Sequence, residues 1–180
     1  MQMIFRITTS DDKDVLSRPS VPDYDPELDD VSSVLSDLCS WITDAGAAHF
    51  KVDCCGLRWP VDVRTDLAII LPQIPEVLGE LSERGSARLQ FFEQGIERDI
   101  GFTASDEDFE VDCRDLWGNP IVGAHAERIK KTSVYSELSN LALDFINFVE
   151  ARYPEIAVLP LYKQWRTSVF EQTNRVRAAN

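Results

Sequence analysis

Polar and apolar residues alternate in three consecutive segments between residues 86 and 113. A period of two is typical of β-strands that bury one face and leave the other in solvent. Two polar stretches, Glu93-Gln94-Gly95 and Ser105-Asp106-Glu107, separate the segments and have the composition of hairpin turns. The pattern therefore predicts an antiparallel meander, in which Ile100 and Phe102 face one way and Phe109, Val111 and Cys113 share a face.

A helix is expected well before this meander. Apolar side chains repeat at helical spacing from Leu28 to Ala45, and Gly46 is a natural stop. At the other end, Asp25 is a candidate N-cap and Pro26 suits the first helical position.

The remaining segments complete an α+β pattern. Further strands are expected at residues 3–9 and 48–54, and further helices at 75–84 and 132–152. We expect residues 1–180 to form a single globular domain, with one layer of antiparallel sheet covered on one face by two or three helices. An exposed acidic loop is expected at about 10–25, and a frayed tail at about 172–180.

Acidic residues are concentrated in two stretches of the chain. Residues 11–30 hold eight Asp or Glu against two Lys or Arg, and residues 91–127 hold ten against two. Together they account for the formal charge of −13, since the rest of the chain is nearly neutral. A lasting negative field attracts a basic protein partner and repels nucleic acid and anionic membranes. Residues 128–180 are net basic but carry no clustered patch beyond Arg128, Lys130 and Lys131, which disfavours nucleic-acid binding.

The meander predicts where many of these carboxylates point. In its third strand, a period of two places alternate acids opposite the apolar face, and the neighbouring strand adds two more. We expect these side chains to form one acidic docking face, with the nearby loop residue Trp117 as an apolar anchor. The candidate partner-binding acids are Glu97, Asp99, Asp106, Asp108, Glu110 and Asp112.

Two other interpretations of the acidic strand stay open. Solvated sheet faces are often charged, and charge on exposed strands prevents aggregation at sheet edges. The spacing from Asp106 to Asp112 also resembles a calcium-binding loop, but its sixth position is Val111 instead of Gly and its twelfth is Trp117 instead of Glu. No metal or cofactor is expected.

The residues that carry most enzyme chemistry form no known motif here. Four cysteines are present, at positions 39, 54, 55 and 113. They lack zinc-site spacing, and Cys54 and Cys55 would point to opposite faces of a strand. Reduced, partly buried thiols are expected. His49 begins an apolar strand, and a general-base role for His125 is a weak alternative.

The small size, the acidity, the missing catalytic motifs and the segment from Phe91 to Arg98 resemble immunity proteins of bacterial polymorphic-toxin systems, whether contact-dependent or type VI secreted. The resemblance covers the general layout of the chain. It implies a cytoplasmic, non-enzymatic antidote that binds a cognate toxin and occludes its active site. Many such toxins are basic, which suits a negative surface.

Two other functional classes remain as alternatives. One is an adaptor or regulatory binding module without a toxin partner. The other is a small enzyme that uses His125 or a cysteine, and a pocket joining His125 or Cys54 to a carboxylate would favour it. No apolar run is long enough to span a bilayer, and no secretory signal is evident after Met1. A cytoplasmic location is expected, and the sequence leaves the oligomeric state open.

Overall fold

The structure, a computed structural model, describes residues 1–7, 20–25, 27–92 and 97–178. Three sequence expectations lie outside the described residues: the acidic loop as far as residue 19, Pro26 as the first helical residue, and the turn Glu93-Gln94-Gly95.

Helices and strands are mixed along the chain, which confirms the α+β class. The first half contains β1 (Gln2–Ile7), α1 (Val31–Asp44), β2 (Ala48–Cys54), β3 (Leu57–Trp59), a π-helical turn η1 (Val63–Leu67) and α2 (Ala68–Arg84). The second half contains β4 (Ser86–Phe91), β5 (Arg98–Ser105), β6 (Asp108–Asp115), β7 (Glu127–Lys130), α3 (Lys131–Arg152), α4 (Pro154–Ala157) and α5 (Pro160–Ala178).

The strands form two antiparallel sheets, with orders β1-β2-β3 and β4-β5-β6-β7. The predicted meander is the four-stranded sheet, and Phe102 lies opposite Val111 as the alternation indicates. Two features differ from expectation. A second sheet joins the single predicted layer, and β7 adds a fourth strand at the edge of the meander that the alternation predicted.

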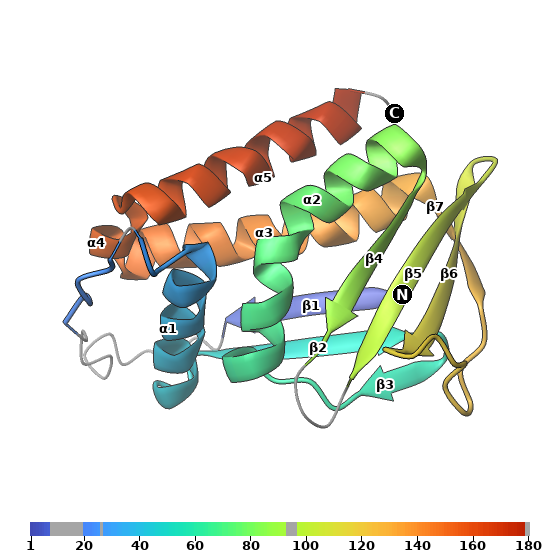
Figure 1. The fold of residues 1–180 in the computed structure, drawn as a ribbon, viewed down its shortest axis with the longest axis horizontal. Coiled ribbons are helices and arrows are strands. Elements are labelled where there is room, and N and C mark those ends of the chain that lie inside the picture. Colours follow the sequence, from blue (N-terminus) through green and yellow to red (C-terminus); the bar gives the residue numbers. More distant parts are fainter. Residues whose placement is uncertain (8–19, 26, 93–96, 179–180) are drawn as a thin grey trace.

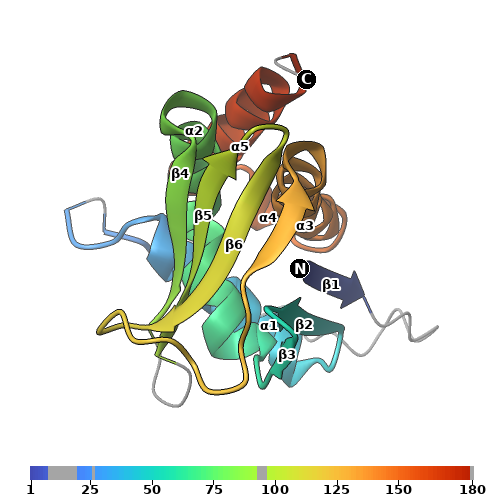
Figure 2. The same ribbon diagram turned by 90° about the vertical axis from the view of Figure 1, so that its right-hand side faces the viewer.

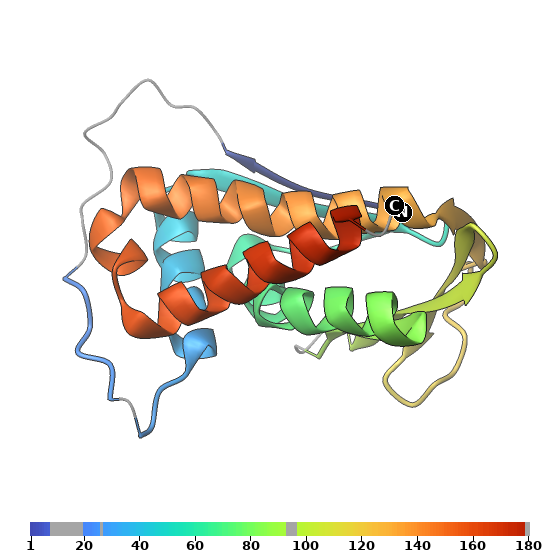
Figure 3. The same ribbon diagram turned by 90° about the horizontal axis from the view of Figure 1, so that it is seen from above.

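Helices cover one face of the four-stranded sheet and leave the other open. In Figure 1, α2, α3 and α5 lie on one side of β4–β7, and α5 packs against both α2 and α3. Figure 2 looks onto the outer face, over which no described helix lies. Figure 3, seen from above, shows α3 running along β1 and β2, and α3 contacts β1. One continuous hydrophobic core joins the helices to the inner faces of both sheets.

Two helix boundaries differ from the sequence expectation. Helix α1 begins at Val31 instead of near Asp25, because the carboxylate of Asp30 accepts the N–H groups of Ser32 and Ser33 and so caps the helix. Helix α5 continues through residues 172–178, where a frayed tail was expected. Its buried face extends through Thr173 and Val176, so the apolar stripe anchors this end.

A glutamine side chain closes part of the free edge of β4. The Nε2 group of Gln73 donates to the carbonyl of Gln90 at 2.8 Å, and the N–H of Gln90 donates to Oε1 of Gln73 at 3.0 Å. Gln73 lies in α2, which begins at Ala68 and continues through Pro72 and Pro75, whereas the expected helix began at residue 75. The amide therefore forms the two bonds that a neighbouring strand would form at this residue.

Candidate functional site

The predicted acids of β6 lie on the open face of the four-stranded sheet. Asp108, Glu110 and Asp112 alternate with buried apolar residues, as the period of two indicates. Asp99 of β5 lies on the same face, because it is paired in register with Arg114, two residues beyond Asp112. Figure 2 faces this surface.

Basic residues on the same face balance these carboxylates. The ion pairs join Asp108 to Lys130 at 2.9 Å, Asp112 to Arg114 at 2.7 Å and Asp99 to Arg88 at 2.6 Å. Glu110 lies directly opposite Arg128 in the register of β6 and β7. The expected acidic docking face is therefore corrected to a face of mixed charge. The basic residues come largely from β7 and from β4, whose faces were not assigned from the sequence.

Asp99 is buried although it belongs to the open face. Its side chain is 7% exposed, and one carboxylate oxygen accepts a hydrogen bond from Arg88 Nη1 at 2.6 Å. The other oxygen, Oδ1, has no hydrogen-bond partner among the described residues. Gly101 makes room for this arrangement, since a Cβ there would lie 2.4 Å from Asp112 Oδ1 and 3.9 Å from Arg88 Cζ. Asp99 is thus a packed structural carboxylate and is not displayed to a partner.

Glu97 and Asp106 lie at opposite ends of β5. Glu97 immediately precedes the strand, and Asp106 follows it in the turn to β6, with a positive φ of 52°. The eight residues of β5 separate them by roughly 25–30 Å. The seven predicted partner-binding residues therefore do not form one patch. Glu97 lies close to Trp117, because the Glu97 carbonyl accepts the N–H of Leu116 at 3.2 Å.

Trp117 is displayed by a loop that hydrogen bonds hold in one shape. Trp117 is 76% exposed, and the nearby residues Leu116 and Val122 are 39% and 97% exposed. The carboxylate of Asp115 accepts the N–H of Trp117 at 3.0 Å, and the N–H and side-chain amide of Asn119 at 2.7 and 2.9 Å. We call residues 116–122 the Trp117 loop.

Further backbone bonds close this loop. The N–H of Asp115 donates to the carbonyl of Asn119, and Arg114 forms an isolated bridge with Pro120. The hydrogen bonds from Asn119 and from the backbone also lower the pKa of the Asp115 carboxyl, which favours its charged form. The loop therefore holds an exposed indole without support from a partner.

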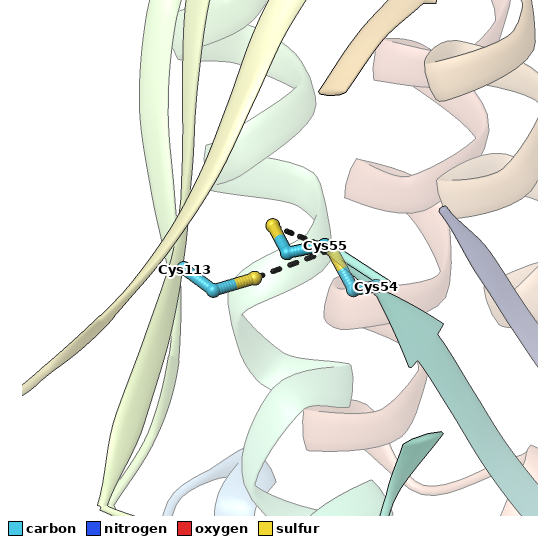
Figure 4. A group of neighbouring side chains, drawn as sticks. All are labelled: Cys54, Cys55 and Cys113. Carbon is cyan, nitrogen blue, oxygen red and sulfur yellow. Dashed lines mark hydrogen bonds between the residues drawn. The ribbon is translucent and has the colours of Figure 1, made fainter. Parts of the chain in front are cut away.

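Three cysteines meet where the two sheets approach one another, as Figure 4 shows. The Sγ atoms of Cys54 and Cys55 lie 3.7 Å apart, and Cys113 Sγ lies 3.4 Å from Cys54 Sγ. All three sulfurs lie within 4.8 Å of one another, and all three residues are buried. The expectation that Cys54 and Cys55 point to opposite faces is wrong. We call these residues the cysteine cluster.

The turn between β2 and β3 explains why neighbouring thiols converge. Cys54 pairs with Leu57, so Cys55 and Gly56 form a two-residue hairpin turn with φ values of 55° and 76°. Positive φ at both positions is typical of a type I′ turn, where Asn, Asp or Gly is preferred. A cysteine in this conformation costs about 1 kcal/mol. Its thiol is thereby directed toward the core instead of away from it.

Neighbouring groups affect ionisation within the cysteine cluster. Hydrogen bonds from Cys113 and Cys54 lower the pKa of the Cys55 thiol, whereas hydrogen bonds to Cys54 and Cys55, together with burial, raise the pKa of Cys113. The first proton is therefore lost more easily than those that follow. Cys39, by contrast, lies in α1 away from the cluster, and burial raises its pKa.

Contacts from the segment after the Trp117 loop cover the turn that holds Cys55. The N–H of His125 donates to the Cys55 carbonyl at 3.1 Å, and Glu127 Oε1 accepts the N–H of Gly56 at 2.9 Å. A Cβ on Gly56 would lie 2.2 Å from the His125 ring, so the ring rests against the turn backbone. Glu127 also accepts from the amino group of Met1 at 2.8 Å.

The enzyme alternative required a pocket that joins His125 or Cys54 to a carboxylate. An open groove of about 720 Å³ lies between α2 and β4, but neither residue lines it. Much of its charged lining is instead engaged in ion pairs, such as that of Arg84 with Glu80. His125 is exposed against the β2–β3 turn.

In comparisons with known proteins, no family model, no curated protein and no solved structure matches this chain. Across the described ranges, no helix is long and apolar enough to cross a membrane. The candidate sites therefore rest on geometry alone. Sequence reasoning placed Trp117 in a loop, where the structure shows it exposed, and missed the cysteine cluster. The Cys55-Gly56 pair, read as a two-residue turn, was the local signal for the cluster, but nothing local points to Cys113.

Proposed function

We propose that this chain is a cytoplasmic immunity protein, which binds a cognate secreted toxin domain and covers the active site of that domain. The observation that carries the binding part of this proposal is the exposure of Trp117 on the Trp117 loop. The choice of a toxin as partner rests on the sequence resemblance and on the formal charge of −13.

Trp117 has the properties of an interface anchor. Tryptophan is enriched among the few residues that dominate binding energy, and its loss typically costs about 2 kcal/mol or more at such positions. The hydrogen bonds of Asp115 fix the loop before binding, so little conformational entropy remains to be lost on docking. Leu116 and Val122 extend the apolar surface around the indole.

The negative charge available to a partner lies mainly outside the sheet face. Asp23, Asp25 and Glu27 precede α1 and are exposed, and no ion pair joins them to a base within the described part of the chain. Such unpaired surface charge increases the rate at which a basic partner associates, more than it increases final affinity. We therefore propose that Asp23, Asp25 and Glu27 speed the association of a basic partner, and that the Trp117 loop holds the partner once it is bound.

The test uses the C-terminal domain of the large secreted protein that this proposal expects in the neighbouring upstream reading frame. We expect the two purified proteins to form a complex, and Trp117→Ala to weaken it at least about 30-fold. Phe170→Ala is the matched control, because Phe170 is also an exposed aromatic residue but lies on α5. Its affinity should equal that of the unaltered protein.

Two outcomes would contradict the proposal in different ways. Equal affinity of Trp117→Ala and the unaltered protein would remove the anchor while leaving the toxin partner in place. Failure of the toxin domain to bind, or binding without loss of its toxic activity, would rule out an immunity function and favour the adaptor alternative.

A further inference from the structure

The cysteine cluster has the dimensions of a metal-thiolate site. Zinc–sulfur bonds are about 2.3 Å long, so three sulfurs around one ion lie about 3.8–4.0 Å apart in tetrahedral or trigonal geometry. The sulfur of Cys54 lies 3.7 Å from that of Cys55 and 3.4 Å from that of Cys113. For these two pairs the required adjustment is a few tenths of an ångström, and the third pair, Cys55 and Cys113, lies within 4.8 Å; rotation about the Cα–Cβ bonds supplies such movements.

We propose that Cys54, Cys55 and Cys113 bind a soft, thiophilic metal ion of the zinc, cadmium or copper(I) class through three thiolates. The site goes beyond the proposed function, because it lies in the core and involves no partner protein. Figure 4 shows the three side chains pointing toward one another from β2, from the turn after it and from β6.

Two features separate the cysteine cluster from ordinary core packing of cysteine. Its members come from different sheets and still place all three sulfurs within 4.8 Å of one another. Cys55 also occupies a left-handed turn position that favours Asn or Gly. The backbone is therefore strained at the residue whose thiol points into the cluster. Cys39 serves as the comparison, since it is equally buried but packs alone in α1.

The ligand set selects the kind of ion. Thiolates are soft ligands that prefer zinc, copper(I) and similar ions, whereas magnesium and calcium need oxygen ligands. In the binding step, each S–H bond breaks, a metal–sulfur bond forms and the proton passes to solvent. With zinc, three thiolates leave one net negative charge in the site. Gly56, which follows Cys55 directly, is exposed, and the exposed His125 ring rests against it, so the turn that holds Cys55 reaches the surface.

The experiment is a cadmium titration of the reduced full-length protein in a non-thiol reductant. Sulfur-to-cadmium charge-transfer absorption should rise in the ultraviolet and saturate at one ion per chain, and bound zinc should be displaced in competition. Cys54→Ser, Cys55→Ser and Cys113→Ser should each lose this saturable absorption. Cys39→Ser should retain it, because that thiol lies outside the cluster.

The Cys55→Gly variant distinguishes loss of metal binding from loss of folding. Glycine suits the positive φ of this turn, so the metal-free variant should have the same circular dichroism spectrum and a thermal midpoint close to that of the unaltered protein. It should nevertheless lose cadmium binding and the rise in thermal midpoint that cadmium causes.

Three results would overturn the inference. They are a lack of charge-transfer absorption in the unaltered protein, equal cadmium binding by Cys55→Gly, and loss of binding in Cys39→Ser alone. A mass decrease of two hydrogens with a bond between Cys54 and Cys113, in a protein that binds no cadmium when reduced, would assign the cysteine cluster to disulfide chemistry instead.

Discussion

The sulfur of Cys113 lies 3.4 Å from the sulfur of Cys54, although the two residues belong to different sheets and are 59 positions apart in the chain. The contact places β6 against the end of β2, and Cys55 Sγ adds a weak bond to the Val111 carbonyl at 3.7 Å. Because β6 leads directly into the Trp117 loop, the same strand carries the cysteine cluster at one position and the candidate docking loop a few residues later.

The electrostatic part of the binding proposal predicts a difference between two triple variants of equal charge. Neutralising Asp23, Asp25 and Glu27 to the corresponding amides should slow association with a basic partner several-fold at low salt. Neutralising the three β6 acids should slow it less, because basic neighbours already balance them. Stopped-flow association rates at increasing salt measure both. A larger effect of the β6 variant would restore the sheet face as the docking surface.

The ion pair between the half-exposed Arg88 and the buried Asp99 predicts that losing either partner has a different effect on stability. Arg88→Ala leaves a buried carboxylate without its partner and should reduce the free energy of unfolding by about 2–3 kcal/mol. Asp99→Asn leaves Arg88, which is half exposed and can be solvated, and should cost about 1 kcal/mol or less. Urea unfolding of both variants measures the difference, and equal losses would contradict the assignment of Asp99 as the buried partner.

Two tyrosines with raised pKa values, the buried Tyr162 and the half-buried Tyr24, predict a loss of stability at alkaline pH. Burial raises the pKa of Tyr162, and burial together with a hydrogen bond to Asp37 raises that of Tyr24. The folded state therefore retains these protons longer than the unfolded state does. This contribution is complete below the unfolded pKa of about 10 and is lost as pH rises above it. Thermal melts between pH 8 and about 11 should show the decline.

Tyr162→Phe and Tyr24→Phe should have different effects on the free energy of unfolding at neutral pH. The Tyr162 hydroxyl is buried and has no hydrogen-bond partner among the described residues, so its removal should leave stability unchanged or raise it by up to about 1 kcal/mol. Tyr24→Phe removes the bond to Asp37 and should cost about 0.5–1.5 kcal/mol. Both variants should lose less stability at high pH. A destabilised Tyr162→Phe protein would show that its hydroxyl is satisfied.

The closure of the β4 edge predicts a role for Gln73 that Gln90 does not share. Gln73→Ala removes two hydrogen bonds to the strand backbone and should cost about 1–2 kcal/mol. Gln90→Ala is the control, because only its backbone takes part in these bonds. Light scattering during mild heating should rise for Gln73→Ala alone, since an open strand edge promotes association. Identical behaviour of the two variants would contradict this role.

The local sequence pattern was sufficient to predict a strand and its buried face where the alternation of polar and apolar residues marks both. The alternation from Phe109 to Cys113 predicted the buried face of β6, and the pattern from Ala48 predicted β2 with its observed bounds. Local rules could not choose between Asp25 and Asp30 as the N-cap, because both residue types suit that position and both accept nearby backbone N–H groups. The choice follows from where burial of the helix begins, at Val34.

Features that depend on contacts between distant residues could not be predicted locally. The strand β7 has four residues and takes its structure from pairing with β6, which also brings Arg128 and Lys130 to the acidic face. The meeting of Cys113 with Cys54 depends on the packing of two sheets. Trp117 was predicted correctly as a loop residue, because Gly118 and Pro120 mark the turn in the sequence itself.

Because all four cysteines are buried, their reactivity can be used as a probe of local unfolding. Alkylating reagents react only with thiols that reach solvent, so each labelling rate reports a local separation of packed layers. Cys39 becomes reactive when α1 leaves the core, whereas Cys113 becomes reactive when the two sheets part. Comparing the two rates would map the order in which the helical and sheet portions come loose.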